Sequence, residues 1–149
     1  MVPELSISGI NGSIQIAGCA IFLAKGISKD AVLVGMSAFC RSLSGIKSDD
    51  EWLKYSGVNF GGLPCEIFLQ FGKQSLIEVS LSVTMPGATL EGGWPTREDI
   101  DQEISFMRGM LSNQLGRSFE VGIQEFPWGV AYSVFEERGF CVNSGLRYF

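Results

Sequence analysis

The chain has 149 residues, 46% hydrophobic and 18% charged, with 11 lysines and arginines against 16 aspartates and glutamates. This length predicts a single domain, residues 1–149, that can build a core without metal or disulfide support. The net charge of −5 argues against nucleic acid and anionic membranes as partners, because both are bound through basic patches. Histidine is missing, which removes the commonest general base and a common metal ligand.

The first predicted element is a β-hairpin. Asn11-Gly12 is typical of a type I′ turn, because that turn needs positive φ at both central positions. Pairing of Ile10 with Ser13 would place Ile7 opposite Ile16. This register gathers isoleucines on one face and polar residues on the other, as expected for a hairpin with one buried face.

A helix is predicted to begin after Ser28, whose side chain suits the N-cap position. Asp30 then lies in the first turn, near the positive end of the helix. Gly45 is the expected end of the helix. Apolar residues at helical spacing define its buried face: Val32, Met36, Phe39, Cys40 and Leu43.

Three strands are expected next. Residues 51–60 form an extended segment with poor alternation, whereas residues 65–71 and 77–83 alternate between apolar and polar positions. Residues 72–75, between the last two strands, have the composition of a turn. The alternation predicts antiparallel strands with one solvated face.

The strongest helix signal follows a glycine- and proline-rich loop over residues 85–95. Thr96 is the expected N-cap, and Asp99 occupies the capping-box position three residues later. Gly116 is expected to end the helix. The apolar face consists of Ile100, Ile104, Met107, Leu111 and Leu115.

The remaining chain predicts strands over residues 119–123, 128–135 and 140–148, with a turn at residues 136–139. Strands and helices do not alternate singly, so the pattern favours an α+β fold over a parallel, doubly wound one. The expected architecture is an antiparallel sheet of about six to seven strands with two main helices packed on it.

The N-terminal segment lacks the basic and apolar regions of a signal peptide, and no apolar stretch approaches the ~20 residues of a membrane span. We therefore expect a cytoplasmic protein. A zinc site or two disulfides are open interpretations of the cysteines, but the missing C-x-x-C spacing favours free, buried thiols. The four cysteines are Cys19, Cys40, Cys65 and Cys141.

No residue pattern points to catalysis. Acidic residues cluster at 49–51 and 98–103, where they also serve helix termini and solubility. Glycine-rich phosphate-binding motifs, a nucleophile elbow and EF-hand spacing do not occur. We therefore expect no catalytic residue, no metal site and no cofactor, and a protein that is not an enzyme.

The negative charge lies entirely in the second half of the chain. Residues 1–75 contain six basic and six acidic residues, whereas residues 76–149 contain five basic and ten acidic residues. A solvated acidic face is one explanation, and a surface that attracts a basic protein is the other.

We expect a binding surface to include residues around the start of the second helix and the turn at 136–139. Trp94 suits an interface anchor, although it is equally suited to pack against the helix. The candidate partner-binding residues are Trp94, Glu98, Asp101, Glu136 and Glu137, with Asp49 and Asp50 as further candidates.

Several segments resemble small bacterial immunity proteins, which are encoded beside toxins of type VI secretion and other polymorphic-toxin systems. The segments that carry this resemblance are Gly26–Leu33, Trp52–Tyr55, the acidic helix after Trp94–Thr96, Pro127–Ser133 and Gly145–Tyr148. The resemblance implies a non-enzymatic protein that binds and neutralises a cognate toxin or effector acting in the cytoplasm. An acidic surface would then occlude the active site of the toxin.

Two alternatives stay open. The order of elements is similar to that of type III secretion chaperones, which are dimers that hold an effector segment. This chain departs from that pattern by its N-terminal hairpin and by the missing closing helix. A small carboxylate-dependent enzyme is the second alternative. A free strand edge would allow either a monomer or a homodimer.

Overall fold

The computed structural model describes the backbone of residues 2–47, 50–87, 90–91 and 94–149, and the side chains of these residues outside 40–50 and 90–94. A seven-stranded antiparallel sheet dominates this part of the chain, with strand order β10-β11-β12-β7-β6-β5-β4. Its strands are β4 (Cys40–Lys47), β5 (Asp50–Phe60), β6 (Leu63–Gly72), β7 (Ser75–Val83), β10 (Ile123–Phe126), β11 (Gly129–Glu136) and β12 (Cys141–Tyr148).

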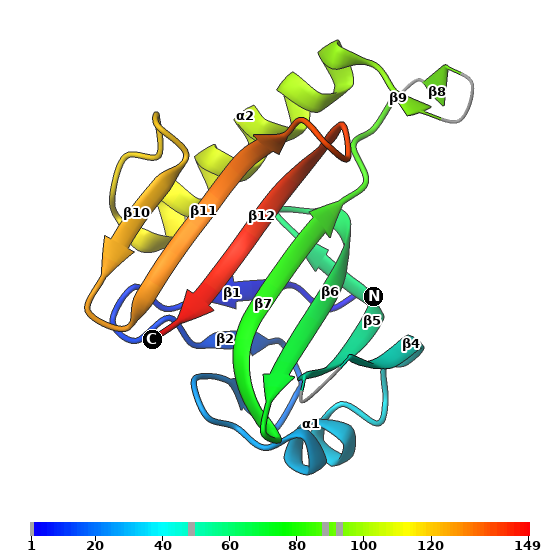
Figure 1. The fold of residues 1–149 in the computed structure, drawn as a ribbon, viewed down its shortest axis with the longest axis vertical. Coiled ribbons are helices and arrows are strands. Elements are labelled where there is room, and N and C mark those ends of the chain that lie inside the picture. Colours follow the sequence, from blue (N-terminus) through cyan, green and yellow to red (C-terminus); the bar gives the residue numbers. More distant parts are fainter. Residues whose placement is uncertain (1, 48–49, 88–89, 92–93) are drawn as a thin grey trace.

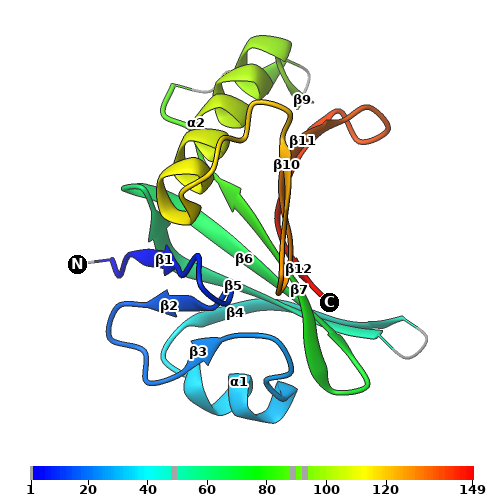
Figure 2. The ribbon, with the colours of Figure 1, turned by 90° about the vertical axis from the view of Figure 1, so that its left-hand side faces the viewer.

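The expected α+β class is confirmed, with more sheet than helix. Helix α2 (Arg97–Leu115) packs on β11 and β12, and the three-stranded sheet of β1 (Leu5–Ile7), β2 (Ile14–Ile16) and β3 (Phe22–Leu23) lies on the same side (Figures 1 and 2). Both predicted helices are present, although the first is shorter than predicted. Helix α1 (Lys29–Gly35) is short and lies beside the β6–β7 turn, where Lys29 N donates to the carbonyl oxygen of Gln74.

The first predicted helix is longer than the observed one, α1. Its N-cap is correct, since the Ser28 hydroxyl oxygen accepts a hydrogen bond from Ala31 N, but the helix ends at its C-cap Met36. Cys40 and Leu43 instead belong to β4, which pairs with β5. The serine-rich segment of β4 is a poor helix former, and strand pairing satisfies its backbone groups.

The predicted N-terminal hairpin exists, but its register is shifted by two residues. Ile7 pairs with Ile14 instead of Ile16, and Leu5 takes the place opposite Ile16. A longer loop replaces the expected two-residue turn, and Ile10 in this loop is 92% exposed. A shift of two positions keeps every side chain on its face, so the predicted apolar face is still the buried one.

The β6–β7 hairpin follows the prediction, whereas the segments that flank α2 differ from it. The turn between β6 and β7 has positive φ at Lys73 and Gln74. The predicted strand at 119–123 is wrong, since Gly122 closes a turn on Phe119 with φ 85° and β10 begins at Ile123. The two-residue strands β8 (Leu90–Glu91) and β9 (Trp94–Pro95) pair with each other before α2.

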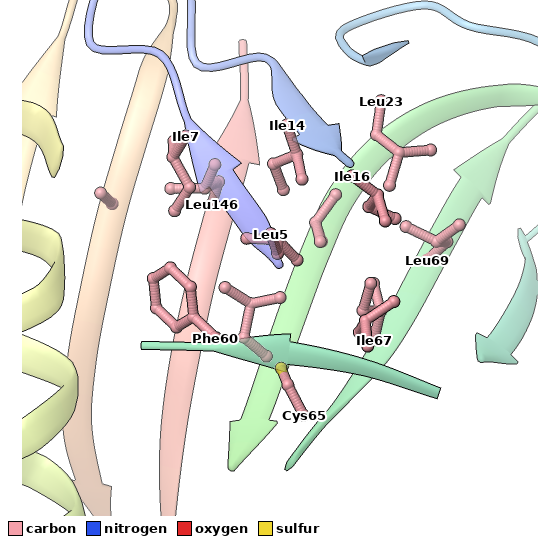
Figure 3. Close-up of a cluster of buried hydrophobic side chains, with 14 of the residues drawn as sticks. Leu5, Ile7, Ile14, Ile16, Leu23, Phe60, Cys65, Ile67, Leu69 and Leu146 are labelled. Atoms are coloured by element: carbon pink, nitrogen blue, oxygen red, sulfur yellow. The ribbon is translucent and has the colours of Figure 1, made fainter. Parts of the chain in front are cut away.

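The core fills the space between the two sheets and α2. Figure 3 shows apolar side chains of the N-terminal hairpin meeting those of the large sheet. The buried residues in this view include Leu5, Ile7, Ile14, Ile16, Phe60, Cys65, Ile67, Leu69 and Leu146. Burial of this apolar surface is the main source of stability. Neither helix of the described chain has both the length and the apolar character needed to cross a bilayer.

Three hydrogen bonds also attach the N-terminal hairpin to residues in the second half of the chain. Trp128 Nε1 donates to the carbonyl oxygen of Gly9 at 3.3 Å, and Tyr148 Oη donates to that of Gly12 at 2.7 Å. The side-chain oxygen of Gln114 on α2 accepts from Ile7 N at 2.7 Å. The hairpin is therefore attached to α2, to the β10–β11 turn and to β12.

Candidate functional site

The start of α2 is held by a complete capping box. The hydroxyl oxygen of Thr96 accepts a hydrogen bond from Asp99 N at 3.1 Å, and Asp99 Oδ2 accepts one from Thr96 N at 3.2 Å. This satisfies backbone groups that a helix start leaves open. The cap fixes the orientation of the first turn, from which Glu98 and Asp101 project into solvent.

The β11–β12 turn packs against this helix start. The guanidinium group of Arg97 lies 4.1 Å from the ring centroid of Phe135, and Arg97 Nε donates to Asp101 Oδ1 at 3.0 Å. Phe140, beyond the turn, packs edge-on against Phe135 at 5.5 Å between ring centroids. The contact joins residues that are almost 40 positions apart in the sequence.

Four predicted partner-binding residues therefore lie at one end of the molecule. Glu98 and Asp101 lie on the first turns of α2, and Glu136 and Glu137 lie at the β11–β12 turn, and all four side chains are exposed. The start of α2 and the β11–β12 turn lie at the same end of the molecule (Figure 1). These four residues are referred to below as the acidic end.

The other predicted residues lie elsewhere or outside the description. Asp49 is outside the described residues, and the side chains of Asp50 and Trp94 are not described. The backbone of Trp94 belongs to β9, directly before the N-cap of α2. Asp50 pairs with Gly72 next to the β6–β7 turn, so its backbone lies at the far end of β7 from the acidic end.

A pocket of about 470 Å³ lies beside the acidic end, between the end of β7, the start of α2 and the start of β12. Its apolar walls include Val83, Met85, Pro95, Ile100 and Val142, and the carboxylates of Asp99 and Glu103 also line it. It is referred to below as the Glu103 pocket. No lysine or arginine is among the described residues that line it.

The two carboxylates of the Glu103 pocket differ in their hydrogen bonding. Asp99 is part of the helix cap, as described above. Glu103 is half-buried, and no other described residue forms a hydrogen bond or an ion pair with its carboxylate. Burial raises the pKa of Glu103 to about 7, because the charged form loses solvation without gaining a partner. The pocket therefore offers one free carboxylate to a ligand.

Glu103 belongs to the acidic cluster predicted at residues 98–103 and is not among the predicted partner-binding residues. A signal was present, since Glu103 follows Ile100 by three residues and precedes Met107 by four. Those two residues are on the buried face of α2, so helical spacing directs position 103 towards the same face. A carboxylate at such a position was a candidate for a raised pKa.

Three cysteines, Cys19, Cys65 and Cys141, are free thiols, and the side chain of Cys40 lies outside the described side chains. Cys65 is buried, and burial raises the pKa of its thiol to about 12. Burial also raises the pKa of Cys141, with Glu136 adding to the effect. Cys19 is half-buried and its thiol donates to the carbonyl oxygen of Gly35. No group of three cysteines, aspartates or glutamates in the described residues is arranged to hold a metal ion.

Arg108 is bound within the fold and is not free for a ligand. A shallower depression of about 390 Å³ lies on another side of α2 and is lined by Arg108, Asp101 and Glu120. Arg108 donates from Nε to the carbonyl oxygen of Ser133 and from Nη1 to that of Glu120. These bonds attach the segment before β10 to α2, which is a structural role.

Comparison of the chain with protein-family models, curated proteins and solved structures found no match. The residues of the acidic end and of the Glu103 pocket are therefore the basis for the function proposed below.

Proposed function

We propose that the protein binds a basic partner protein through the acidic end, in the manner of an immunity protein that neutralises a cytoplasm-acting toxin. The observation that carries this proposal is the contact between Arg97 and Phe135, which brings two acidic segments together. Residues 97–103 and 136–138 contain six carboxylates and two arginines. Such a concentration of one sign of charge attracts an oppositely charged protein and accelerates its association.

Inhibition is the role that this surface suits. The capping box of α2 and the β11–β12 hairpin hold the backbone from which these charges project, so a partner meets them already gathered on one surface. If the partner is an enzyme that acts on an anionic substrate such as a nucleic acid, its active site is basic. The acidic end would occupy that site in place of the substrate, as the sequence resemblance to immunity proteins implies.

Co-expression with the product of the neighbouring gene tests this function. We expect the neighbouring product to be lethal alone and harmless when this protein is present. A neighbour that is harmless alone, or equally lethal in the presence of this protein, would contradict the proposal.

Charge-reversal variants test the location of the interface. In the double variant Glu98→Lys/Glu137→Lys we expect slower association with the partner and a weaker dependence of the association rate on salt. The matched control is Asp30→Lys/Glu125→Lys, which changes two exposed carboxylates outside the acidic end by the same total charge. Equal association rates for the two double variants would exclude the acidic end as the interface. Circular dichroism checks that both variants are folded.

A further inference from the structure

We propose that the Glu103 pocket binds a lysine side chain of the partner protein, with the aliphatic stem against the apolar walls and the ammonium group at Glu103. This inference rests on the function proposed above, because it identifies the group through which the partner is recognised. It adds a specific pocket to what is otherwise a general attraction between charges.

The pocket has the size and position that such a contact needs. Its volume of about 470 Å³ lies within the range of ligand-binding pockets, roughly 300–1,000 Å³. Asp99 and Ile100, which line it, belong to the same helical turns that carry Glu98 and Asp101. A partner docked on the acidic end therefore has the pocket directly beside it.

The lining combines apolar walls with a carboxylate, which matches the apolar stem and the charged end of a lysine side chain. Lysine combines four methylene groups, which pack on apolar surface, with a terminal charge that needs hydrogen-bond acceptors. Val83, Ile100 and Val142 supply apolar wall, and Glu103 supplies a carboxylate. No described lining residue is basic, so nothing in the lining competes for this carboxylate.

The unpaired state of Glu103 favours a cationic ligand over a neutral one. A half-buried carboxylate without a partner has lost solvation, and an ammonium group would compensate this loss through a charge-assisted hydrogen bond. The raised pKa of Glu103 is consistent with this, because it reports that the charged form lacks a counter-ion.

One free carboxylate fits lysine better than arginine. A guanidinium group carries five N–H donors in a rigid fork, and several of them would stay unpaired in a pocket whose other carboxylate, on Asp99, is bound in the helix cap. Unpaired buried donors are costly. The compact ammonium group has three donors and leaves fewer of them without a partner.

Direct titration with small probes tests the pocket without the partner. The probes are N-acetyl-lysine methylamide, its arginine counterpart and the norleucine counterpart, which has a similar chain without the charge. Binding is followed by NMR through the methyl groups of Ile100 and Val142. We expect saturable shifts with the lysine probe at millimolar concentration and binding at least ~10-fold weaker with norleucine, as expected for loss of a charge-assisted bond.

Variants assign the binding to Glu103. In Glu103→Gln we expect the affinity for the lysine probe to fall at least ~10-fold, whereas Glu125→Gln, with an exposed carboxylate on β10 outside the acidic end, should bind as the unmodified protein does. Equal binding by Glu103→Gln, or an arginine or norleucine probe that binds as tightly as lysine, would overturn the proposal.

The probe titrations and the co-expression test can fail independently of each other. Loss of toxin neutralisation in the Glu98→Lys/Glu137→Lys variant with no binding of any probe would leave the acidic end as the interface and refute the lysine pocket. Binding of the lysine probe together with a failed co-expression test would refute the partner protein as the source of the ammonium group.

Discussion

Gly145 lies opposite Tyr132 in the register of β11 and β12, and a Cβ atom at position 145 would be 2.9 Å from the hydroxyl oxygen of Tyr132. The same atom would overlap the carbonyl oxygen of Val79 on β7. Gly145 therefore permits close packing at the junction where β12 joins β7 and the large sheet becomes continuous. Tyr132 is buried, and strand alternation places it on the sheet face opposite to Phe135, which contacts the start of α2.

The first prediction concerns this junction. We expect Gly145→Ala to lower the free energy of unfolding by about 3 kcal/mol, because the added methyl group forces the backbone of β7 or the ring of Tyr132 to move. The measurement is urea unfolding followed by tryptophan fluorescence.

Gly109→Ala is the matched control for Gly145→Ala. Position 109 is an exposed site inside α2, and an added Cβ atom would meet nothing within 4 Å. Alanine there should raise the free energy of unfolding by about 0.5–1 kcal/mol through its better helix propensity. Equal unfolding midpoints for the two variants would refute the role assigned to Gly145.

The second prediction concerns the bond between Tyr148 and Gly12. Tyr148→Phe removes the donor and leaves a buried carbonyl group without its partner, so the free energy of unfolding should fall by about 1–2 kcal/mol. Hydrogen exchange should show the largest loss of protection at the hairpin amides of Ser8 and Gly12. Ser6→Ala, on the exposed face of the same hairpin, serves as control. A uniform loss of protection along the chain would contradict a local role.

The third prediction is the pH dependence of Glu103. Its folded-state pKa of about 7 lies above the ordinary value of 4.5, so its ionisation destabilises the folded state as the pH rises between these two values. The titratable groups nearest to it are Asp99 on its own helix, Cys65 on β6 and Cys141 on β12. Burial raises the pKa of both thiols, so both are neutral across this pH range.

The test of the third prediction compares Glu103→Gln with the unmodified protein. At pH 8 we expect the variant to be more stable by about 1–2 kcal/mol, a value reduced for the partial exposure of the carboxylate. The difference should disappear near pH 4.5, where the carboxyl group is neutral in the folded state. Glu125→Gln, exposed on β10, controls for the loss of one negative charge. A difference that does not change with pH would contradict the assigned pKa.

The fourth prediction concerns the ion pair between Lys29 and Glu51, which joins α1 to β5. The hydrogen bond from Lys29, supported by one from Gln74, lowers the pKa of Glu51 below 4.5. The pair therefore stabilises the folded state above pH 4.5, and this contribution is lost as the pH falls through the folded-state pKa.

Lys29→Met tests the fourth prediction. We expect this variant to be less stable than the unmodified protein at pH 6, with the difference shrinking at pH 3. Lys25→Met removes an exposed lysine for which no ion pair is found in the described chain, and should show no such change. If Lys29→Met differed from the unmodified protein in its free energy of unfolding as much at pH 3 as at pH 6, the stabilising role of the Lys29–Glu51 pair would be refuted.

Local chemistry determined the parts of the fold that were predicted correctly. Thr96, Asp99 and Gly116 mark the two ends of α2 through their own side chains and backbone preferences, and the structure confirms all three. The alternation in β6 and β7 likewise identifies both strands and their buried faces.

The errors arose where tertiary contacts override local preference. The segment after Met36 has helical spacing, but pairing with β5 makes it a strand. The Asn11-Gly12 turn signal is overridden by Trp128, whose indole ring packs against Gly12. Trp128 is far from Gly12 in the sequence, so no local pattern predicts their contact. β5 directly follows β4, but its poor alternation gives no clear signal for this hairpin.

The candidate site was predictable only in part. Glu98 and Asp101 could be assigned to one helical turn from their spacing, and Glu136 and Glu137 to one turn. These four residues lie at one end of the molecule because Arg97 packs on Phe135. Arg97 and Phe135 are distant in sequence, so local patterns do not predict this contact. The Glu103 pocket requires β7, α2 and β12 together and has no sequence signature of its own.

The attachment of the N-terminal hairpin has a consequence for folding. Its hydrogen bonds to Gln114, Trp128 and Tyr148 span 107, 119 and 136 positions of the chain. Contacts of such separation need nearly the whole polypeptide to be in place, and they slow folding because the entropy of closing long loops is lost first. During synthesis the hairpin is made before α2, Trp128 and Tyr148, so it cannot make these contacts until those residues have also been made. Until then its isoleucines are exposed, which leaves this segment open to aggregation during synthesis.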